Sequence, residues 1–98
     1  VVYSASKSAL EAYSRSLALE LASQGIRSNC IAPAMVKTPM FDKFDDEKMK
    51  EHGENYPLGF GEPIDVANAV SFLLSDASSW VTGTRMVLDG GLSIQHKK

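Results

Sequence analysis

Two short strand-like segments, residues 26–32 and 85–88, most constrain the fold of this chain, because a helix-forming stretch separates them in the sequence. The first ends at Pro33, which has no N–H to give to a sheet, and the second at Asp89-Gly90-Gly91. Strands joined across a helix pair in parallel, with a right-handed crossover. Two parallel strands are not a stable sheet, and parallel sheets are covered on both faces. The pattern therefore predicts an α/β fold in which these strands belong to a larger parallel sheet.

The first helix is expected over residues 4–24. Its bulky apolar residues recur at spacings of three and four, so we expect them to be buried: Leu10, Tyr13, Leu17 and Leu21. A second stripe is made of small side chains: Ala5, Ala9, Ala12 and Ser16. A smooth face of this kind suits the close approach of another helix in an oligomer, although alanine is also simply a good helix former. Gly25 is expected to end the helix in a left-handed conformation.

Another helix is expected to begin at Gly61-Glu62-Pro63, with Asp65 in its positive first turn, and to end near Asp76. Its predicted buried face consists of Val66, Val70, Leu73 and Leu74. Before it, Thr38-Pro39 suits a helix start. Residues 42–56 are charged and poorly periodic, and we expect a mobile lid with an apolar underside there. The predicted order is helix, strand, lid, helix, strand.

Composition narrows the functional classes. The 98 residues suffice for one small domain or a piece of a larger one, and a net charge of −2 gives no electrostatic reason to bind nucleic acid or an anionic membrane. The single cysteine, Cys30, excludes a disulfide framework and a cysteine-rich zinc site, and we predict no metal site. No apolar run approaches the roughly 20 residues that span a bilayer. The start lacks both Met and a signal-peptide pattern, so we expect a cytoplasmic protein and a chain that begins inside a longer sequence.

Tyr3 and Lys7 are the first candidates for chemistry. They stand four residues apart, which makes them neighbours on one helix face, and we expect that face to point into the fold. An ammonium group beside a phenol favours the phenolate, and the positive end of a helix acts in the same direction, whereas burial opposes both. A phenol poised in this way is a general acid–base for a carbonyl or an alcohol. Taken alone, the pair is as well explained by a packed tyrosine beside a solvated lysine.

Other segments strengthen the chemical interpretation. Tyr3-Ser4-Ala5-Ser6-Lys7 resembles the active-site motif of the short-chain dehydrogenase/reductase family. Four later stretches resemble further parts of the same family. Residues 26–33 resemble the strand that leads to the nicotinamide pocket, and residues 33–38 resemble the Pro-Gly-x-(Ile/Val)-x-Thr segment. Residues 57–67 resemble the turn and helix after the substrate loop, and residues 80–91 resemble the closing loop with the last strand. The resemblance implies the C-terminal half of a Rossmann-like, doubly wound parallel sheet. Residues 1–98 would then be the C-terminal part of a single NAD(P)-binding domain, without its N-terminal nucleotide-binding half.

The resemblance also implies roles for individual residues. Tyr3 is the proton donor for ketone reduction and the acceptor for alcohol oxidation, and Lys7 binds the nicotinamide ribose. The implied contacts to the cofactor, which is NADP or NAD with NADP slightly preferred, are Tyr3, Lys7, Pro33, Ala34, Met35, Val36 and Thr38. Thr38 could equally serve only as a helix cap. Ala34 stands where the family has glycine, so a positive φ there would be costly. The implied substrate lid is Met40, Phe41 and Phe44.

The activity implied for the full-length protein is hydride transfer between NAD(P)H and a small-molecule ketone or secondary alcohol. A 3-oxoacyl thioester is the nearest substrate class. The family's phosphate-binding turn and its catalytic Ser and Asn precede the Tyr motif, so we expect residues 1–98 alone to be inactive. The resemblance further implies a homotetramer or homodimer through the first helix and the last helix and strand. The alternative is a truncated, non-catalytic product that acts only as an oligomerisation or interaction module.

Overall fold

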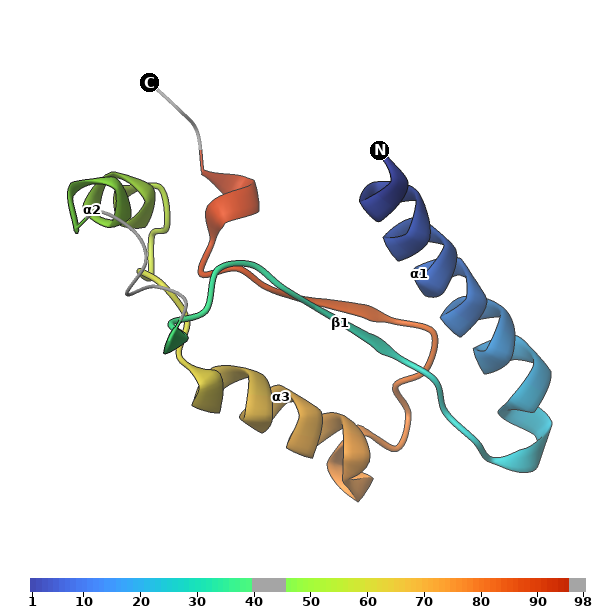
Figure 1. Cartoon of the computed structure of the whole chain (residues 1–98). Coiled ribbons are helices and arrows are strands. Elements are labelled where there is room, and N and C mark those ends of the chain that lie inside the picture. Colours follow the sequence, from blue (N-terminus) through green and yellow to red (C-terminus); the bar gives the residue numbers. More distant parts are fainter. Residues whose placement is uncertain (40–45, 96–98) are drawn as a thin grey trace. The chain divides into compact units, whose positions relative to one another are not determined.

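The computed structural model describes residues 1–39 and 46–95 (Figure 1). The elements along the chain are helix α1 (Val2–Leu21), the 3₁₀ turn η1 (Ala22–Gln24), strand β1 (Cys30–Pro33), helices α2 (Asp46–Glu54) and α3 (Pro63–Leu74), the 3₁₀ turn η3 (Asp76–Ser78), strand β2 (Arg85–Leu88) and the 3₁₀ turn η4 (Leu92–Ile94). The predicted α/β class is confirmed.

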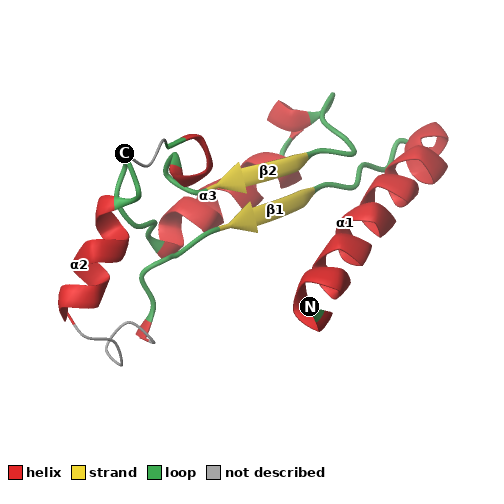
Figure 2. Ribbon diagram, turned by 90° about the horizontal axis from the view of Figure 1, so that it is seen from above, coloured by secondary structure: helices red, strands yellow, loops and turns green. Residues whose placement is uncertain are grey.

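Strands β1 and β2 are neighbours in a two-stranded sheet and run in the same direction (Figure 2). The amide of Cys30 donates to the carbonyl of Thr84 at 2.9 Å, and the amide of Ala34 donates to the carbonyl of Leu88, also at 2.9 Å. Both strands advance by four residues between these bonds, as a parallel register requires. Since α3 lies between the strands in the sequence, β1, α3 and β2 form the predicted βαβ unit.

The first strand begins later than predicted, at Cys30 instead of residue 26. Just before it, side-chain bonds accompany a backbone bond, in which the amide of Gly83 donates to the carbonyl of Ser28 at 2.8 Å. The amide of Ser28 donates to the hydroxyl of Thr82 at 3.1 Å, and Asn29 accepts from the amide of Thr84 through Oδ1 at 3.0 Å. Residues 26–29 therefore connect α1 to the sheet through a mixture of side-chain and backbone bonds, and the regular strand begins at Cys30.

The chain divides into two compact units: residues 1–31 with 71–86, and residues 32–70 with 87–98. In the first unit, α1 packs through small residues. Its buried residues are Ser14 and Ala18, and a Cβ added at Gly83 would lie 3.6 Å from the Cβ of Ala18. The predicted burial of the bulky stripe is wrong for Leu10 and Tyr13, which are 63% and 61% exposed. Small side chains form the contact because they let the backbone at Gly83 come close to the helix.

The ends of the helices follow the predicted local signals. Gly25 has a φ of 72° and donates its amide to the carbonyl of Ala22, so it ends the turn η1 as expected. Helix α3 begins at Pro63, and the carboxylate of Asp65 accepts the amide of Glu62 at 2.7 Å. This bond satisfies a backbone donor at the positive end of the helix.

The buried face of α3 differs in part from the prediction. Ala69 and Leu73 are each 9% exposed, whereas Val70 and Leu74 are exposed. Leu73 was predicted correctly, and the prediction for Val70 and Leu74 is wrong. An α-helix turns by about 100° per residue, so each of these two side chains lies about a quarter-turn from the buried residue that precedes it.

In the second unit, the predicted lid contains a helix. Residues 46–54 form α2, with acidic residues in its first turn and His52 in its last turn. This arrangement suits the helix dipole and supports a helix without an apolar stripe. The lid residues Met40, Phe41 and Phe44 lie outside the described residues, as do the positions that would continue a helix from Thr38-Pro39.

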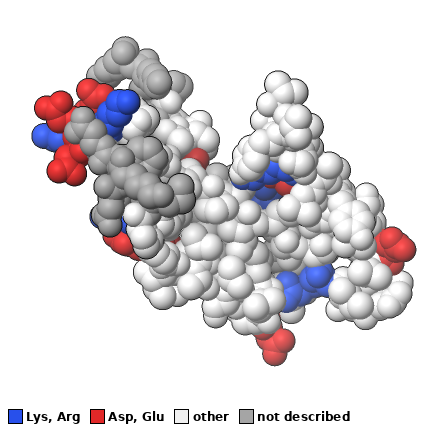
Figure 3. Space-filling view, in the orientation of Figure 1, with Lys and Arg blue, Asp and Glu red and all other residues white. Residues whose placement is uncertain are grey.

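Acidic and basic side chains are mixed over α2 in the view of Figure 3. The helix therefore presents no field of a single sign on this face. Among the described residues, no helix combines the length and the apolar character that crossing a bilayer requires.

Candidate active site

The Tyr3–Lys7 pair lies in the first two turns of α1. The Nζ atom of Lys7 is 6.0 Å from the centroid of the Tyr3 ring, which confirms that the two side chains are neighbours. Val1, the residue before the helix, gives no side-chain cap, so the positive end of the helix dipole adds to the charge of Lys7. Tyr3 is 74% exposed and Lys7 is half-buried. The expectation that Tyr3 points into the fold is therefore wrong for the described residues.

The position of the pair on α1 explains this exposure. Tyr3, Lys7, Ser14 and Ala18 recur at spacings of four and seven, so all four lie on the stripe that packs in the first unit. The packing contacts of that stripe start further along the helix, where Glu11 accepts from Nε of Arg85 at 2.8 Å. The first turn extends beyond these contacts. Tyr3 is thus on the packing face but past its covered part.

Polar contacts from distant segments fix the orientation of α1. The hydroxyls of Ser14 and Ser28 share a hydrogen bond of 2.8 Å. The guanidinium of Arg27 donates to the carbonyls of Leu73 at 3.0 Å and Val81 at 3.2 Å, which joins the segment after α1 to the end of α3. Sequence reasoning did not find Glu11, Ser14, Arg27 or Arg85. Periodicity marks a face, but it does not identify the distant partner of a polar side chain.

In the second unit, the segment after β1 is held mainly through its backbone. The amide of Met35 donates to the hydroxyl of Tyr56 at 3.4 Å, and the carbonyl of Met35 accepts from Gly61 at 3.1 Å. Val36 and Gly61 form a parallel bridge. No described residue other than glycine has a positive φ, so Ala34 keeps an ordinary backbone here and the cost anticipated from its Cβ does not arise.

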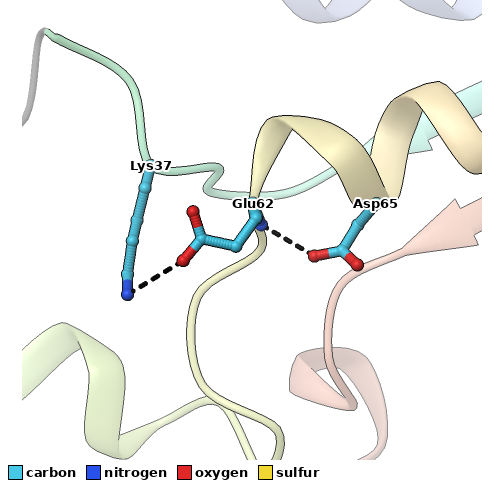
Figure 4. A network of polar contacts seen from close by, with 3 residues as sticks. All are labelled: Lys37, Glu62 and Asp65. Atoms are coloured by element: carbon cyan, nitrogen blue, oxygen red, sulfur yellow. Dashed lines mark hydrogen bonds and ion pairs between the residues drawn. The ribbon is translucent and has the colours of Figure 1, made fainter.

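Charged side chains reinforce the same attachment (Figure 4). The Nζ atom of Lys37 lies 3.1 Å from a carboxylate oxygen of Glu62, and the amide of Lys37 donates to the carbonyl of Gly61 at 2.8 Å. Both side chains of the ion pair are about half exposed, so the pair itself contributes at most about 1 kcal/mol. The backbone bonds therefore set the path of residues 34–37, and the ion pair restrains it further.

A cavity of about 560 Å³ lies in the second unit at the carboxyl ends of the two strands. Its walls are Met35, Val36, Leu58, Gly59, Phe60, Gly61, Asp65, Val66, Val87, Leu88, Asp89, Gly90 and Gly91. Ligands of open α/β sheets bind beyond the carboxyl ends of the strands. Of the predicted cofactor contacts, Met35 and Val36 line this cavity, while Thr38 is exposed and Pro33 ends β1.

The turn after β2 is built around Asp89. Its carboxylate accepts the amide of Ser93 at 2.9 Å and the amide of Gly91 at 3.0 Å. The Ser93 hydroxyl, then the Ser93 amide and the Gly91 amide hold the pKa of Asp89 below its ordinary value. Gly90 and Gly91 have positive φ angles of 57° and 93°, which allow the backbone after Asp89 to turn back so that its amides reach the Asp89 carboxylate.

The predicted site residues thus fall into two groups. Tyr3 and Lys7 belong to the first unit, and Pro33, Ala34, Met35, Val36 and Thr38 belong to the second. Each group has its own local support. The first has an ammonium group beside a phenol at a helix N-terminus, and the second has an anchored backbone segment at the end of a parallel strand.

Known proteins match nearly the whole chain. A family model described as enoyl-(acyl carrier protein) reductase matches residues 1–93. The 3-oxoacyl-[acyl-carrier-protein] reductase of Homo sapiens is 49% identical over 94 residues, which cover 95% of this chain and 38% of that protein. A tropinone reductase homolog of Arabidopsis thaliana is 46% identical over 95 residues, which cover 95% of this chain and 36% of that protein.

A solved structure agrees with these matches. 4-Hydroxyisoleucine dehydrogenase complexed with NADH has a TM-score of 0.85 and 31% sequence identity, over 96% of this chain and 40% of that chain. The chain therefore spans between 36% and 40% of the length of these three proteins.

Proposed function

The chain belongs to the short-chain dehydrogenase/reductase family, and from this premise we propose that the full-length protein transfers a hydride between NAD(P)H and a ketone or secondary alcohol. The observation that carries the proposal is the Tyr3–Lys7 pair, in which an ammonium group lies 6.0 Å from the centre of a phenol ring at the start of a helix. The described residues leave most of Tyr3 uncovered, since it is 74% exposed among them.

In this proposal a bound nicotinamide supplies the hydride, and the residues of this chain move the proton. During reduction, the Tyr3 hydroxyl gives its proton to the carbonyl oxygen as the carbonyl carbon receives the hydride, which yields the alcohol. The Tyr3 phenolate then regains a proton from solvent. Lys7 stabilises that phenolate and donates hydrogen bonds to the ribose hydroxyls. During oxidation, the Tyr3 phenolate accepts the proton of the alcohol.

Each of the two groups of residues, taken by itself, suits part of a nicotinamide cofactor. Lys7 offers ammonium donors that suit sugar hydroxyls, and the cavity at the carboxyl ends of the strands exposes Met35 and Val36. We assign the carboxamide contact to the backbone of residues 34–36 and a polar contact to Thr38. The preference for NADP over NAD stays a prediction, since both cofactors share the nicotinamide end that these residues would bind.

We propose that residues 1–98 form the C-terminal part of a single Rossmann-like domain, because the matched relatives are more than twice as long. The 3-oxoacyl thioester remains the proposed substrate class, and the name of the human relative supports it. A cytoplasmic location and a homotetramer or homodimer also remain proposals. An exposed stripe of small residues on α1 supports oligomerisation: Ala5, Ala9, Ala12 and Ser16. The same stripe equally favours the alternative function, an interaction module without catalysis.

The test compares Tyr3→Phe with Tyr13→Phe in the full-length protein. Tyr13 lies on the same helix and is 61% exposed, so it controls for the loss of a phenol hydroxyl on α1. With NADPH and acetoacetyl-CoA, Tyr3→Phe should lower turnover by roughly 100-fold or more, while binding of NADPH persists. Tyr13→Phe should remain active. If Tyr3→Phe keeps its activity, Tyr3 is not the proton donor. If the unmodified protein is inactive but still oligomerises, the result supports the interaction module.

A further inference from the structure

We propose that Arg85 is a positioning residue, which holds the carboxylate of Glu11 so that it does not pair with Lys7. Lys7 is thereby left beside the ring of Tyr3. The inference rests on the function proposed above for the Tyr3–Lys7 pair, and it adds a residue 74 positions away from Glu11 in the sequence to that site.

The geometry of α1 offers Lys7 two neighbours. Tyr3 lies four residues before it and Glu11 four residues after it, and both spacings bring side chains together on a helix surface. In the structure, the Nζ atom of Lys7 is 6.0 Å from the Tyr3 ring centroid. The Oε1 atom of Glu11 is 2.8 Å from Nε of Arg85. Within the described residues, Arg85 is the cation that the structure pairs with Glu11.

Burial makes this choice of partner consequential. The side chain of Glu11 is 19% exposed, whereas that of Arg85 is 49% exposed. A carboxylate with so little access to water is stabilised by a counter-ion, and without Arg85 the cations one turn away on α1 are Lys7 before it and Arg15 after it. A Lys7–Glu11 pair would offset part of the positive charge that favours the Tyr3 phenolate. The ion pair at Arg85 therefore preserves the charge on which Tyr3 depends.

Other charged groups of the first unit lie on α1 itself or near its C-terminal end: Arg15, Glu20, Arg27 and Asp76. Arg15 is exposed and lines a separate cavity with Ala18 and Gly83. Arg27 and Asp76 line a cavity with Ala22, near the C-terminal end of α1. Arg27 is also bound to backbone carbonyls. Cys30 is the titratable group on β1, and Arg85 is the charged residue on β2. Among the described charged groups of the first unit outside α1, Arg85 is thus the one whose side chain bonds to a side chain of α1.

The first test follows the contact itself in the full-length protein, with no cofactor. Nuclear Overhauser effects between the Lys7 side chain and the Tyr3 ring should weaken in Arg85→Met, because Lys7 turns toward Glu11. They should persist in Arg85→Lys, which keeps a cation for Glu11. They should return in the double variant Glu11→Gln/Arg85→Met, in which Glu11 no longer carries a charge. Circular dichroism checks that α1 remains folded in each variant.

The second test follows the pH dependence of turnover in the full-length protein. In Arg85→Met, the pH midpoint should move upward by roughly 0.3 units, since water screens the interaction of Lys7 with the exposed Tyr3. The double variant should return the midpoint to that of the parent. A purely structural role for Arg85 predicts that the double variant is no better than Arg85→Met, and this result overturns the proposal.

The two tests separate the possible failures. If the Lys7–Tyr3 contact is the same in the parent and in Arg85→Met, Arg85 does not position the pair, and this conclusion does not depend on the turnover that either protein shows. If the contact responds as expected but Tyr3→Phe keeps its activity, the proposed function fails while the positioning of Lys7 stands.

Discussion

A methyl group added at Gly90 should destabilise this protein far more than one added at Gly25. Both glycines have a positive φ, of 57° and 72°. An alanine at either position therefore meets the cost of a left-handed backbone, which is about 1–2 kcal/mol. The surroundings differ. A Cβ at Gly25 has nothing within 4 Å, whereas a Cβ at Gly90 would lie 2.9 Å from the carbonyl oxygen of Gly59.

The backbone around Gly59 has little freedom to move away. Its own amide donates to the carbonyl of Tyr56 at 2.8 Å, and the amide of the preceding residue, Leu58, donates to the carbonyl of Gly90 at 2.9 Å. Relieving the clash strains or breaks the bond to Gly90, which is worth about 1 kcal/mol, and overpacking adds about 1–3 kcal/mol. We expect Gly90→Ala to cost about 3 kcal/mol or more, and Gly25→Ala about 1 kcal/mol.

Urea unfolding of the full-length protein, followed by circular dichroism, measures both variants against the parent. At a slope of about 3 kcal/mol per molar urea, Gly90→Ala should lower the midpoint by roughly 1 M. Gly25→Ala should lower it by about a third as much. Equal shifts for the two variants would refute the reasoning, because they would mean that the turn at Gly59 does not resist a side chain at Gly90.

Three further predictions concern single residues. The pKa of Asp89 is lowered in the folded chain, so its hydrogen bonds stabilise the fold fully at pH values above the ordinary carboxyl pKa. This stabilisation is lost as the pH falls through the pKa of the folded chain. Asp89→Asn should therefore flatten the loss of stability that urea unfolding measures between about pH 5 and pH 3. Arg27→Met should lower the free energy of unfolding by about 1.5–3 kcal/mol, because it removes charged donors from the carbonyls of Leu73 and Val81; thermal unfolding measures this, and an unchanged melting temperature would contradict it. Ala34→Gly should destabilise the chain by about 0.5–1 kcal/mol rather than stabilise it, because Ala34 has no positive φ to relieve.

Helix α2 shows where an apolar pattern alone misleads. Residues 46–54 lack an apolar stripe, and a lid was expected there. The helix carries Asp46 and Glu47 in its first turn and His52 in its last, a charge order that is itself a helix signal. Near its end, Gly53 comes close to the ring of Phe60, where an added Cβ would lie 3.4 Å from a ring carbon. The charge order was available from the sequence, but the contact with Phe60 was not.

The sequence by itself determined the features that depend on neighbours along the chain. These include the left-handed end at Gly25, the start of α3 at Pro63 with Asp65, the two strands, and the spacing that places Lys7 beside Tyr3. Backbone preferences and the turn of about 100° per residue act over a few residues, so such features can be read locally.

Only the tertiary structure decided which face of α1 packs and which distant groups hold it. Ser14 and Ala18, not the leucines, form the contact, because small side chains let another backbone approach. Glu11 meets Arg85 across 74 residues, and no periodicity in the sequence encodes that meeting. The identity of a distant partner depends on how whole elements pack, and the surroundings of Tyr3 and Lys7 therefore became visible only in the folded chain.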